Sequence, residues 1–404
     1  MSKLLSIVIP TKNRYFTLIN LVEKLLTWDN DDYEVVVQDN SKDNSDIIDF
    51  LKKYENNKNL RYFHNPIHVT VTQNAEDAIN NSVGDFVCFL GDDDGIVKQS
   101  LVIVRWMKEN QVDSLNCKQG AFNWPEFRYK TSGKKKSLAG MLVYHSHSGS
   151  IEPQNIMQGL DNLLQNGCLE INGIARLYHG IVARRVLNEL KSETGTYFPG
   201  PIADMSSAIG LTFFAKKHYY LHFPIIISGA SGASYAGKSG TKKNTTSFEH
   251  QPWFSKKTLV DWSKQLPKRI VAQTVWPESA IQTLKSLGRE ELISTINCPL
   301  IYASYIVDFP EFKGELEDFI SENYSFNEAS EIRKKMLKYK KQCRRGKLRY
   351  WVKAYAIYFG IEKVLKIEVV DANSIADALT KLETAIETNK TYKNSDFYRI
   401  LNQY

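Results

Sequence analysis

Residues 84–95 read GDFVCFLGDDDG, in which an apolar run of strand length leads directly into three carboxylates, those of Asp92, Asp93 and Asp94. Three adjacent carboxylates repel one another unless a positive group lies among them. Oxygen ligands of this kind suit Mg²⁺ or Mn²⁺, which often share the phosphates of a substrate. The stretch therefore predicts either a metal site at the end of a buried strand or an acidic turn before a helix that begins near Ser100.

Three further strands precede this one, and a polar cluster follows each of them. Apolar runs at 4–10, 34–38, 60–64 and 86–90 alternate with segments of helical spacing at 18–26, from 45, and at 71–82. This order predicts an α/β fold with a mostly parallel sheet and helices on both faces. The polar clusters, at 11–14, 39–41, 64–66 and 91–95, then lie at the carboxyl ends of the strands, where open α/β sheets bind ligands.

The remainder of the chain divides at about residue 248. A helix and strand at 100–116, helices at 155–166 and 180–191, and a strand at 223–228 continue the α/β part. Beyond it, helical spacing dominates and strand patterns nearly vanish. A chain of 404 residues is long enough for two domains. We therefore expect an α/β domain at 1–248 and a mainly helical domain at 249–404.

The net charge of +7 is concentrated in one segment. Residues 333–353 contain eleven lysines or arginines and no acidic residue, interleaved with apolar and aromatic side chains. This composition favours a helix that binds anionic lipid headgroups at a membrane surface. A solvated helical face is the main alternative, and a nucleic-acid site is the least favoured of the three interpretations.

Cysteine spacing and hydropathy indicate the compartment. The five cysteines are odd in number, widely spaced and without a CxxC pair, which argues against a disulfide framework and favours a reducing cytoplasm. No apolar run approaches the roughly 18 residues that a membrane span needs. We expect a cytoplasmic protein, which the basic segment would hold peripherally on the inner face of the plasma membrane.

Several segments resemble the family 2 glycosyltransferases with the GT-A fold. SIVIPTKNR at 6–14, VVVQDNS at 35–41 and the opening stretch at 84–95 are similar to the nucleotide-binding half of that family. YHGIVARRVL at 178–187, GPIADM at 200–205 and PIIISGASGASYAG at 224–237 are similar to the acceptor half of its bacterial surface-polysaccharide members, the capsule and O-antigen type. The resemblance covers about residues 6–240 and does not extend to the C-terminal region.

The resemblance implies roles for individual residues. Four of them would line the nucleotide pocket: Pro10, Thr11, Asn13 and Arg14. Asp39 would bind uracil or ribose, and Asn74 would face the nucleotide. Asp92 and Asp94 would be the metal-binding DxD pair, with Asp94 nearest a Mn²⁺ or Mg²⁺ ion. Because Gly91 stands where the family often has its first acidic residue, the alternative pair is Asp93 and Asp94.

The family resemblance also implies an inverting, metal-dependent transfer from a nucleotide sugar. The donor would be a UDP-sugar, and the acceptor a hydroxyl of a growing bacterial surface glycan or lipid-linked glycan. Such a transfer needs a base on the acceptor side. Asp204 is the candidate, because it follows a Gly-Pro turn and opens a helix expected at 205–214, whose dipole favours an ionised carboxylate. The alternative is that Asp204 only caps this helix; Glu193 and Glu170 are the next candidates. Five histidines of this domain, His179 among them, are more often structural than metal ligands.

Two rival functions remain open at this stage. A nucleotidyltransferase acting on sugar phosphates would share a nucleotide-binding α/β fold and acidic metal ligands, but would release pyrophosphate. A non-catalytic polyanion-binding protein would use the basic segment and would have no use for carboxylates in its cleft.

Overall fold

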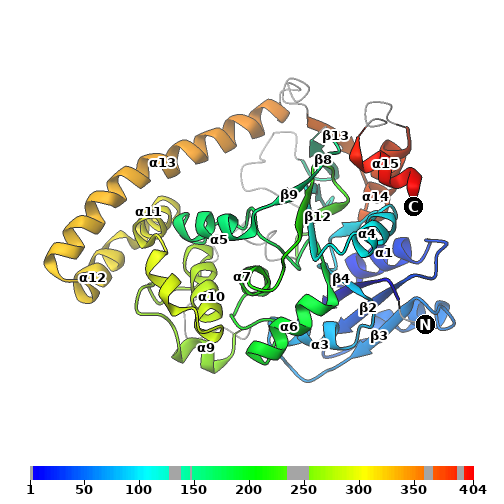
Figure 1. The fold of residues 1–404 in the computed structure, drawn as a ribbon, viewed down its shortest axis with the longest axis horizontal. Coiled ribbons are helices and arrows are strands. Elements are labelled where there is room, and N and C mark those ends of the chain that lie inside the picture. Colours follow the sequence, from blue (N-terminus) through cyan, green and yellow to red (C-terminus); the bar gives the residue numbers. More distant parts are fainter. Residues whose placement is uncertain (1–2, 127–137, 146–147, 234–253, 359–366, 389–394) are drawn as a thin grey trace.

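The computed structural model describes residues 3–126, 138–145, 148–233, 254–358, 367–388 and 395–404. An eight-stranded sheet forms the centre of the α/β part (Figure 1). Its strands in spatial order are β3 (Leu60–His64), β2 (Tyr33–Asp39), β1 (Leu5–Thr11), β4 (Phe86–Phe89), β10 (Gly180–Ala183), β6 (Ser114–Cys117), β11 (His218–Leu221) and β9 (Ile151–Gln154). The first four strands in sequence form where the apolar runs predict them. Three of them, β1, β2 and β4, are almost fully buried, which explains why their sequences are apolar.

The strand register aligns the polar clusters at one edge of the sheet. Thr11 of β1 pairs with Asp39 of β2, and Asp39 pairs with His64 of β3. This arrangement confirms that the polar residues after these strands meet at their carboxyl ends.

The sheet is mixed rather than mostly parallel. Strands β3, β2, β1 and β4 run parallel, but β10 is antiparallel to both of its neighbours, β4 and β6. The prediction of a helix at 180–191 is therefore wrong for its first four residues, which form strand β10. These residues, GIVA, are buried and paired on both sides, and helix α6 (Arg184–Thr194) begins only after them.

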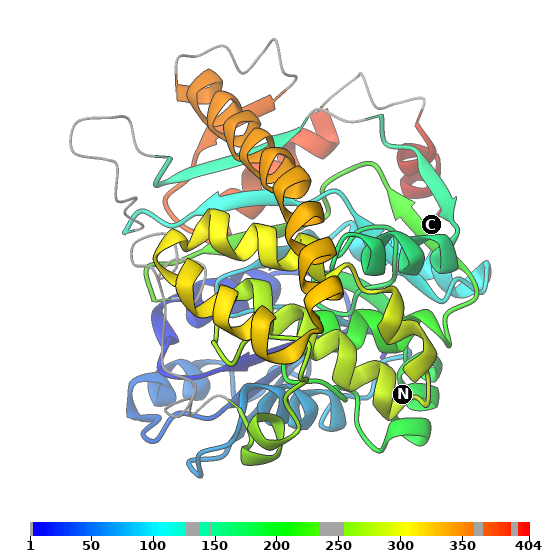
Figure 2. The same cartoon turned by 90° about the vertical axis from the view of Figure 1, so that its left-hand side faces the viewer.

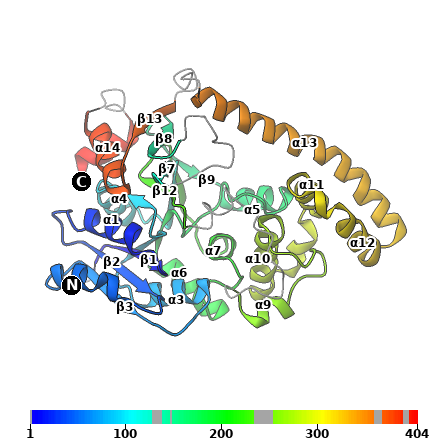
Figure 3. The same cartoon turned by 180° about the vertical axis from the view of Figure 1, so that it is seen from behind.

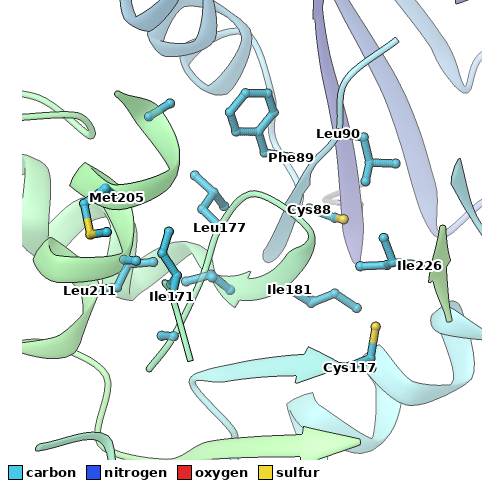
Figure 4. Close-up of a cluster of buried hydrophobic side chains, with 14 of the residues drawn as sticks. Cys88, Phe89, Leu90, Cys117, Ile171, Leu177, Ile181, Met205, Leu211 and Ile226 are labelled. Atoms are coloured by element: carbon cyan, nitrogen blue, oxygen red, sulfur yellow. The ribbon is translucent and has the colours of Figure 1, made fainter. Parts of the chain in front are cut away.

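A second, five-stranded sheet lies beside the first. Its strands in spatial order are β13 (Ile367–Asp371), β8 (Met141–His145), β7 (Gly120–Asn123), β12 (Ile226–Ala230) and β5 (Gly95–Ile96). Strand β5 follows the acidic triplet directly, and β12 pairs with it. Figure 4 shows apolar side chains of the region where the strands of the two sheets meet, with Cys88, Cys117, Ile181 and Ile226 among them. The acidic loop is therefore anchored on both flanks by buried strands.

The helices form two groups, as Figures 1 and 3 show. Those of the α/β part are α1 (Tyr15–Leu25), α2 (Ile48–Lys53), α3 (Val71–Asn80), α4 (Ser100–Glu109), α5 (Ile156–Gln165), α6 and α7 (Ala203–Thr212). The second group comprises α9 (Lys256–Val260), α10 (Ala272–Ser286), α11 (Cys298–Asp308), α12 (Lys313–Asn323) and α13 (Phe326–Tyr358). Short 3-10 helices are η1 (Ser45–Ile47), η2 (Glu290–Thr295) and η3 (Pro310–Phe312).

Helix α10 docks directly on the start of α7. The Ser279 hydroxyl accepts a hydrogen bond from the Ile202 backbone N–H at 3.2 Å and donates to the Ile202 carbonyl at 3.1 Å. Thr283 donates to Ser206 at 3.1 Å. Hydrogen bonds from a neighbouring helix fix the backbone just before α7, and so the helical group fixes the position of Asp204.

The last described elements return to the α/β part. Strand β13 pairs antiparallel with β8, helix α14 (Ile375–Thr388) packs on α1, and α15 (Asp396–Gln403) packs on α4. The Glu383 carboxylate of α14 accepts hydrogen bonds from Lys24 Nζ at 2.7 Å and from the Lys98 backbone N–H at 3.0 Å. The helical region predicted at 249–404 therefore contains a strand and two helices that complete the α/β part.

Helix α13 crosses the outer face of the molecule, as Figure 2 shows. It packs on α11 through one side, where Ala329 and Met336 are buried. Within the described ranges, neither this helix nor any other is long and apolar enough to cross a membrane.

Candidate active site

The acidic triplet lies buried between β4 and β5, and each of its carboxylates has its own set of partners. Asp92 Oδ2 accepts a hydrogen bond from Thr11 Oγ1 at 2.5 Å and pairs with Arg14 Nε at 3.0 Å. Asp93 Oδ2 accepts from the backbone N–H of Ser231 at 3.0 Å and from its hydroxyl at 2.8 Å. Arg14 Nη1 lies 3.7 Å from Asp93 Oδ1, so one guanidinium is shared between two carboxylates.

Asp94 points to the opposite side of the loop. Its Oδ2 accepts hydrogen bonds from the Gly91 N–H at 2.7 Å and the Tyr178 hydroxyl at 2.9 Å, and lies 2.7 Å from His179 Nε2. Its Oδ1 accepts from the Gly229 N–H at 2.8 Å. Four protein groups therefore engage this carboxylate, and it is the most fully satisfied of the three.

Burial and mutual repulsion shift the pKa values of these groups apart. Burial raises the pKa of Asp92 to about 7, although Arg14 opposes the shift. Burial and the neighbouring Asp94 charge raise the pKa of Asp93. Burial also acts to raise the pKa of Asp94, but His179 and the backbone N–H groups outweigh it and lower this pKa overall. Asp92 and Asp93 are thus carboxylates whose negative charge is only partly compensated.

Tyr178 and His179 are site residues that the sequence analysis did not assign. Their rings stack with centroids 3.8 Å apart, and both contact Asp94. His179 has a φ of 60°, a left-handed conformation that is uncommon outside glycine. The sequence signal that points to them is YHG at 178–180, which begins one of the segments that resemble the family. A histidine in such a segment is more often structural than functional.

The larger cavity, of about 900 Å³, lies beside Asp92 and Asp93. Asn13, Arg14 and Thr17 line it together with Ser231. Tyr15 and the exposed ring of Phe16 also face it, and Asn373 reaches it from the segment before α14. Of the residues predicted for the nucleotide pocket, Asn13 and Arg14 line this cavity and Thr11 supports it through Asp92.

Pro10, Asp39 and Asn74 do not line either cavity described here. Pro10 is half-buried within β1. Asp39 is fully buried, and its Oδ2 accepts hydrogen bonds from Tyr15 at 2.7 Å and Tyr62 at 2.6 Å. Asn74 donates to the carbonyls of Thr11 and Gln38, each at 3.3 Å, and so ties β1 to β2. These residues brace the ends of the strands in this structure, and Asp39 reaches the cavity only through Tyr15.

A smaller cavity, of about 440 Å³, lies beside Asp94. Tyr178 and His179 line it together with Asp204, Arg176 and Trp276. The groups that contact Asp94 thus line one cavity, and those that contact Asp92 and Asp93 line the other. The three carboxylates are not themselves among the residues that line the cavities, but side chains that contact them line both. We call the triplet, with contacts in both cavities, the acidic wall.

Asp204 is the second residue of α7, and Ile202 occupies the N-cap position. The structure thus does not support the alternative that Asp204 is only a helix cap. Burial raises its pKa to about 6; the charges of His179 and Arg176 oppose the shift, and that of Asp94 adds to it. A carboxylate with this pKa is mostly ionised at neutral pH yet more basic than an ordinary aspartate, which suits a general base. Glu170 lines the same cavity but is exposed, and Glu193 is an exposed residue of α6.

The donor chemistry of the triplet fits a hard divalent cation. Such ions are commonly held by one or two carboxylates together with substrate phosphates and water. Asp93 Oδ1 is the most open oxygen, since its nearest partner is Arg14 at 3.7 Å, whereas Asp94 is already saturated. No cluster of three or more histidine, cysteine or acidic side chains in the described parts of the chain forms a complete protein cage. Asp93, with Asp92 beside it, is therefore the better placed metal ligand.

Comparison with known proteins identifies the α/β part. Residues 6–161 match the family model described as glycosyl transferase family 2. An uncharacterized glycosyltransferase of Rickettsia bellii (strain RML369-C) is 23% identical over 239 residues, which are 54% of this chain and 33% of that protein. This chain thus spans about a third of the length of that relative.

The fold is also similar to a solved structure. The crystal structure of S. aureus TarS 1–349 in complex with UDP-GlcNAc gives a TM-score of 0.51 at 15% sequence identity, covering 85% of this chain and 92% of that chain. At this identity the likeness shows the fold, an α/β domain with a mixed sheet followed by helices. Residues 6–161 are therefore similar to a glycosyltransferase family 2 domain, and the α/β part to which they belong has a GT-A-like fold.

Proposed function

We propose that this protein is an inverting, metal-dependent glycosyltransferase that moves a sugar from a nucleotide sugar, of the UDP class, to a hydroxyl group of a glycan. The observation that carries the proposal is that side chains contacting the acidic wall line two cavities. One cavity offers Arg14 beside two carboxylates whose charge it only partly compensates, and the other offers Asp204, a carboxylate suited to take up a proton. A transferase needs two such compartments, one for the donor and one for the acceptor, with the reacting atoms between them.

The donor would occupy the larger cavity. Arg14 would bind the diphosphate, because a guanidinium pairs well with phosphate oxygens and is already held in place by Asp92. The ring of Phe16 would pack against the base, with Tyr15 and Asp39 supporting the nucleoside side. A divalent cation held by Asp93 and Asp92 would neutralise negative charge that develops on the diphosphate.

The acceptor would occupy the smaller cavity, with its hydroxyl facing Asp204. The hydroxyl oxygen forms a bond to the anomeric carbon while the bond from that carbon to the diphosphate oxygen breaks. The electron pair of the broken bond leaves with the nucleoside diphosphate, and the hydroxyl proton goes to Asp204. A single displacement of this kind inverts the configuration at the anomeric carbon. Tyr178 and His179 would hold Asp94 in the wall between the two substrates.

The two rival functions fit these observations less well. A polyanion-binding protein would gain nothing from three buried carboxylates between its cavities. A nucleotidyltransferase would attack the α-phosphate rather than a sugar carbon and would release pyrophosphate, and it has no need for a base in a second cavity. The family 2 domain at 6–161 supports the transferase over both.

The decisive experiment is a screen of nucleotide sugars for release of nucleoside diphosphate, with Mn²⁺, with Mg²⁺ and with EDTA. We expect release from at least one UDP-sugar with metal present and its loss with EDTA. Asp93→Asn should weaken the thermal stabilisation that Mn²⁺ gives in the presence of UDP, which tests the metal site without an activity readout. Full activity in EDTA would contradict the metal assignment, and release of pyrophosphate would favour the nucleotidyltransferase.

The acceptor is proposed to be a surface glycan or lipid-linked glycan, reached from the inner face of a membrane. Helix α13 supports this idea through a stripe that we call the basic face, with residues Lys334, Leu337, Lys338, Lys341, Arg345 and Leu348. All six lie on one side of the helix, and Leu337 and Leu348 are 67% and 64% exposed. Among the described residues, the only ion pair of this face is Lys334 with Glu331 at 3.9 Å. Exposed leucines between unpaired cations suit a surface of anionic lipid.

A further inference from the structure

The smaller cavity contains an arginine, Arg176, whose buried Nε atom has no hydrogen-bond partner. Asp204 of the same cavity acts on Arg176 through its charge, but the described residues show no ion pair between the two. The contrast with Arg184 is instructive, because that side chain donates to the Gly84 carbonyl at 2.5 Å and to the Ser82 hydroxyl at 2.8 Å.

A second donor in the same cavity is also unsatisfied. Gln119 lines the cavity, and its Nε2 atom is buried without a partner. A buried charge or amide without a partner is costly, and such groups normally find one. Burial lowers the pKa of Arg176, which is the direction expected for a cation removed from water. Two unsatisfied donors that line one cavity indicate a ligand that supplies acceptor oxygens.

The inference rests on the proposed function and names its acceptor more closely. We propose that the smaller cavity binds an acceptor sugar that carries an anionic group, a carboxylate or a phosphate, and that Arg176 and Gln119 bind this group while a hydroxyl of the same sugar faces Asp204. Trp276, half-buried on the cavity wall, offers an aromatic surface for the sugar ring. A neutral sugar would leave the guanidinium buried and unpaired, so the site would discriminate against it.

The charge pattern of the cavity explains why the anion would not bind at the catalytic end. Asp204 is acted on by the positive charges of His179 and Arg176 and by the negative charge of Asp94. A carboxylate or phosphate would be repelled there and attracted to Arg176. Arg176 and Gln119 would therefore bind the anionic group, and Asp204 would face the hydroxyl.

The test compares three sugars that differ at one position: methyl β-D-glucopyranoside, methyl β-D-glucuronide and methyl β-D-glucopyranoside 6-phosphate. Their binding to the full chain would be measured calorimetrically in the presence of UDP. We expect at least one charged sugar to bind ten-fold or more tightly than the neutral one. Comparing the affinities of the glucuronide and the 6-phosphate then shows whether the site prefers a carboxylate or a phosphate. Arg176→Gln should abolish this preference. Arg344→Gln, which removes the same charge from an exposed position of α13, should leave it unchanged.

Two further measurements keep the outcomes distinct. The melting temperature of Arg176→Gln should equal or exceed that of the wild type, because the variant removes an unpaired buried charge; a lower value would indicate a structural role and count against the proposal. Equal binding of the three sugars, no binding of any, or a preference that survives in Arg176→Gln would overturn it. If the protein binds UDP but does not discriminate among the three sugars, only the inference about the acceptor is contradicted. If it neither binds nor cleaves any nucleotide sugar, the proposed function itself is contradicted.

Discussion

Asp204 combines three properties that a general base needs: it lines the acceptor cavity, it does not cap its helix, and burial raises its pKa to about 6. Asp204→Asn removes the proton acceptor and should lower turnover roughly 10²- to 10⁴-fold with little change in UDP affinity. Glu170→Gln is the matched control, since Glu170 lines the same cavity but is exposed, and it should keep most of the activity.

The pH profile gives an independent check on the same residue. The base works only when ionised, so kcat/KM of the wild type should fall about ten-fold per pH unit below about pH 6. Near wild-type turnover in Asp204→Asn would show that the base lies elsewhere, and Glu170 would then be examined first.

Gly229 shows how tightly the acidic wall is packed. A Cβ atom at this position would lie 1.7 Å from the Asp93 carbonyl oxygen, which is backbone and cannot move aside easily. We expect Gly229→Ala to destabilise the protein by on the order of 3 kcal/mol and to impair Mn²⁺ and UDP binding. Gly314→Ala in α12 is the control, because a Cβ there meets nothing within 4 Å. It should stabilise the helix by about 0.5–1 kcal/mol, as chemical unfolding would show.

Among the elements, α13 makes the clearest prediction about location. Reversing Lys334, Lys341 and Arg345 to glutamate should release the protein from phosphatidylserine vesicles, at roughly 1 kcal/mol per charge, and leave donor cleavage intact. Sedimentation should also fall as salt rises, because the attraction is screened. Reversing three exposed lysines elsewhere, Lys52, Lys216 and Lys264, should have a smaller effect. Equal sedimentation with neutral and anionic vesicles would argue for a solvated helix face instead.

The sequence predicts best the elements whose periodicity is local. The first four strands, their helices and the polar strand ends follow from apolar runs and their spacing, and the structure confirms them. The acidic triplet is recognisable because three buried carboxylates need an explanation. Strand β10 was missed because GIVA is too short to distinguish a strand from a buried helical turn, and only pairing with β4 and β6 decides between them.

Side-chain partners across long sequence separations are not visible in the chain itself. Nothing in the local sequence indicates that Arg14 pairs with Asp92, or that Tyr178 and His179 contact Asp94. The sequence also does not indicate that Arg176 Nε and Gln119 Nε2 lack hydrogen-bond partners, because that depends on which residues surround them in the fold. The sequence predicts candidate site residues, but only the fold shows which of them lie at which cavity.

At the scale of the whole molecule, the donor cavity depends on the C-terminal segment. Asn373 lines that cavity, and Glu383 joins α14 to Lys24 and to the backbone of Lys98. Glu383→Gln leaves Lys24 without its counter-charge and should destabilise the protein by on the order of 1–3 kcal/mol, with weaker UDP binding. Glu387→Gln removes an ion pair with Lys98 that is about half exposed, and should cost about 0–1 kcal/mol. Equal unfolding midpoints for the two variants would show that α14 is only loosely attached.

The return of β13 to β8 has a consequence for synthesis on the ribosome. Strand β8 ends at His145 and its partner begins at Ile367, roughly 220 residues later. At about 5–20 residues per second, the edge of β8 waits roughly 10–45 s for its partner. An unpaired strand edge is prone to pair with other chains. We expect the nascent protein to depend on chaperones during this interval, and its yield to improve when translation is accelerated between β8 and β13.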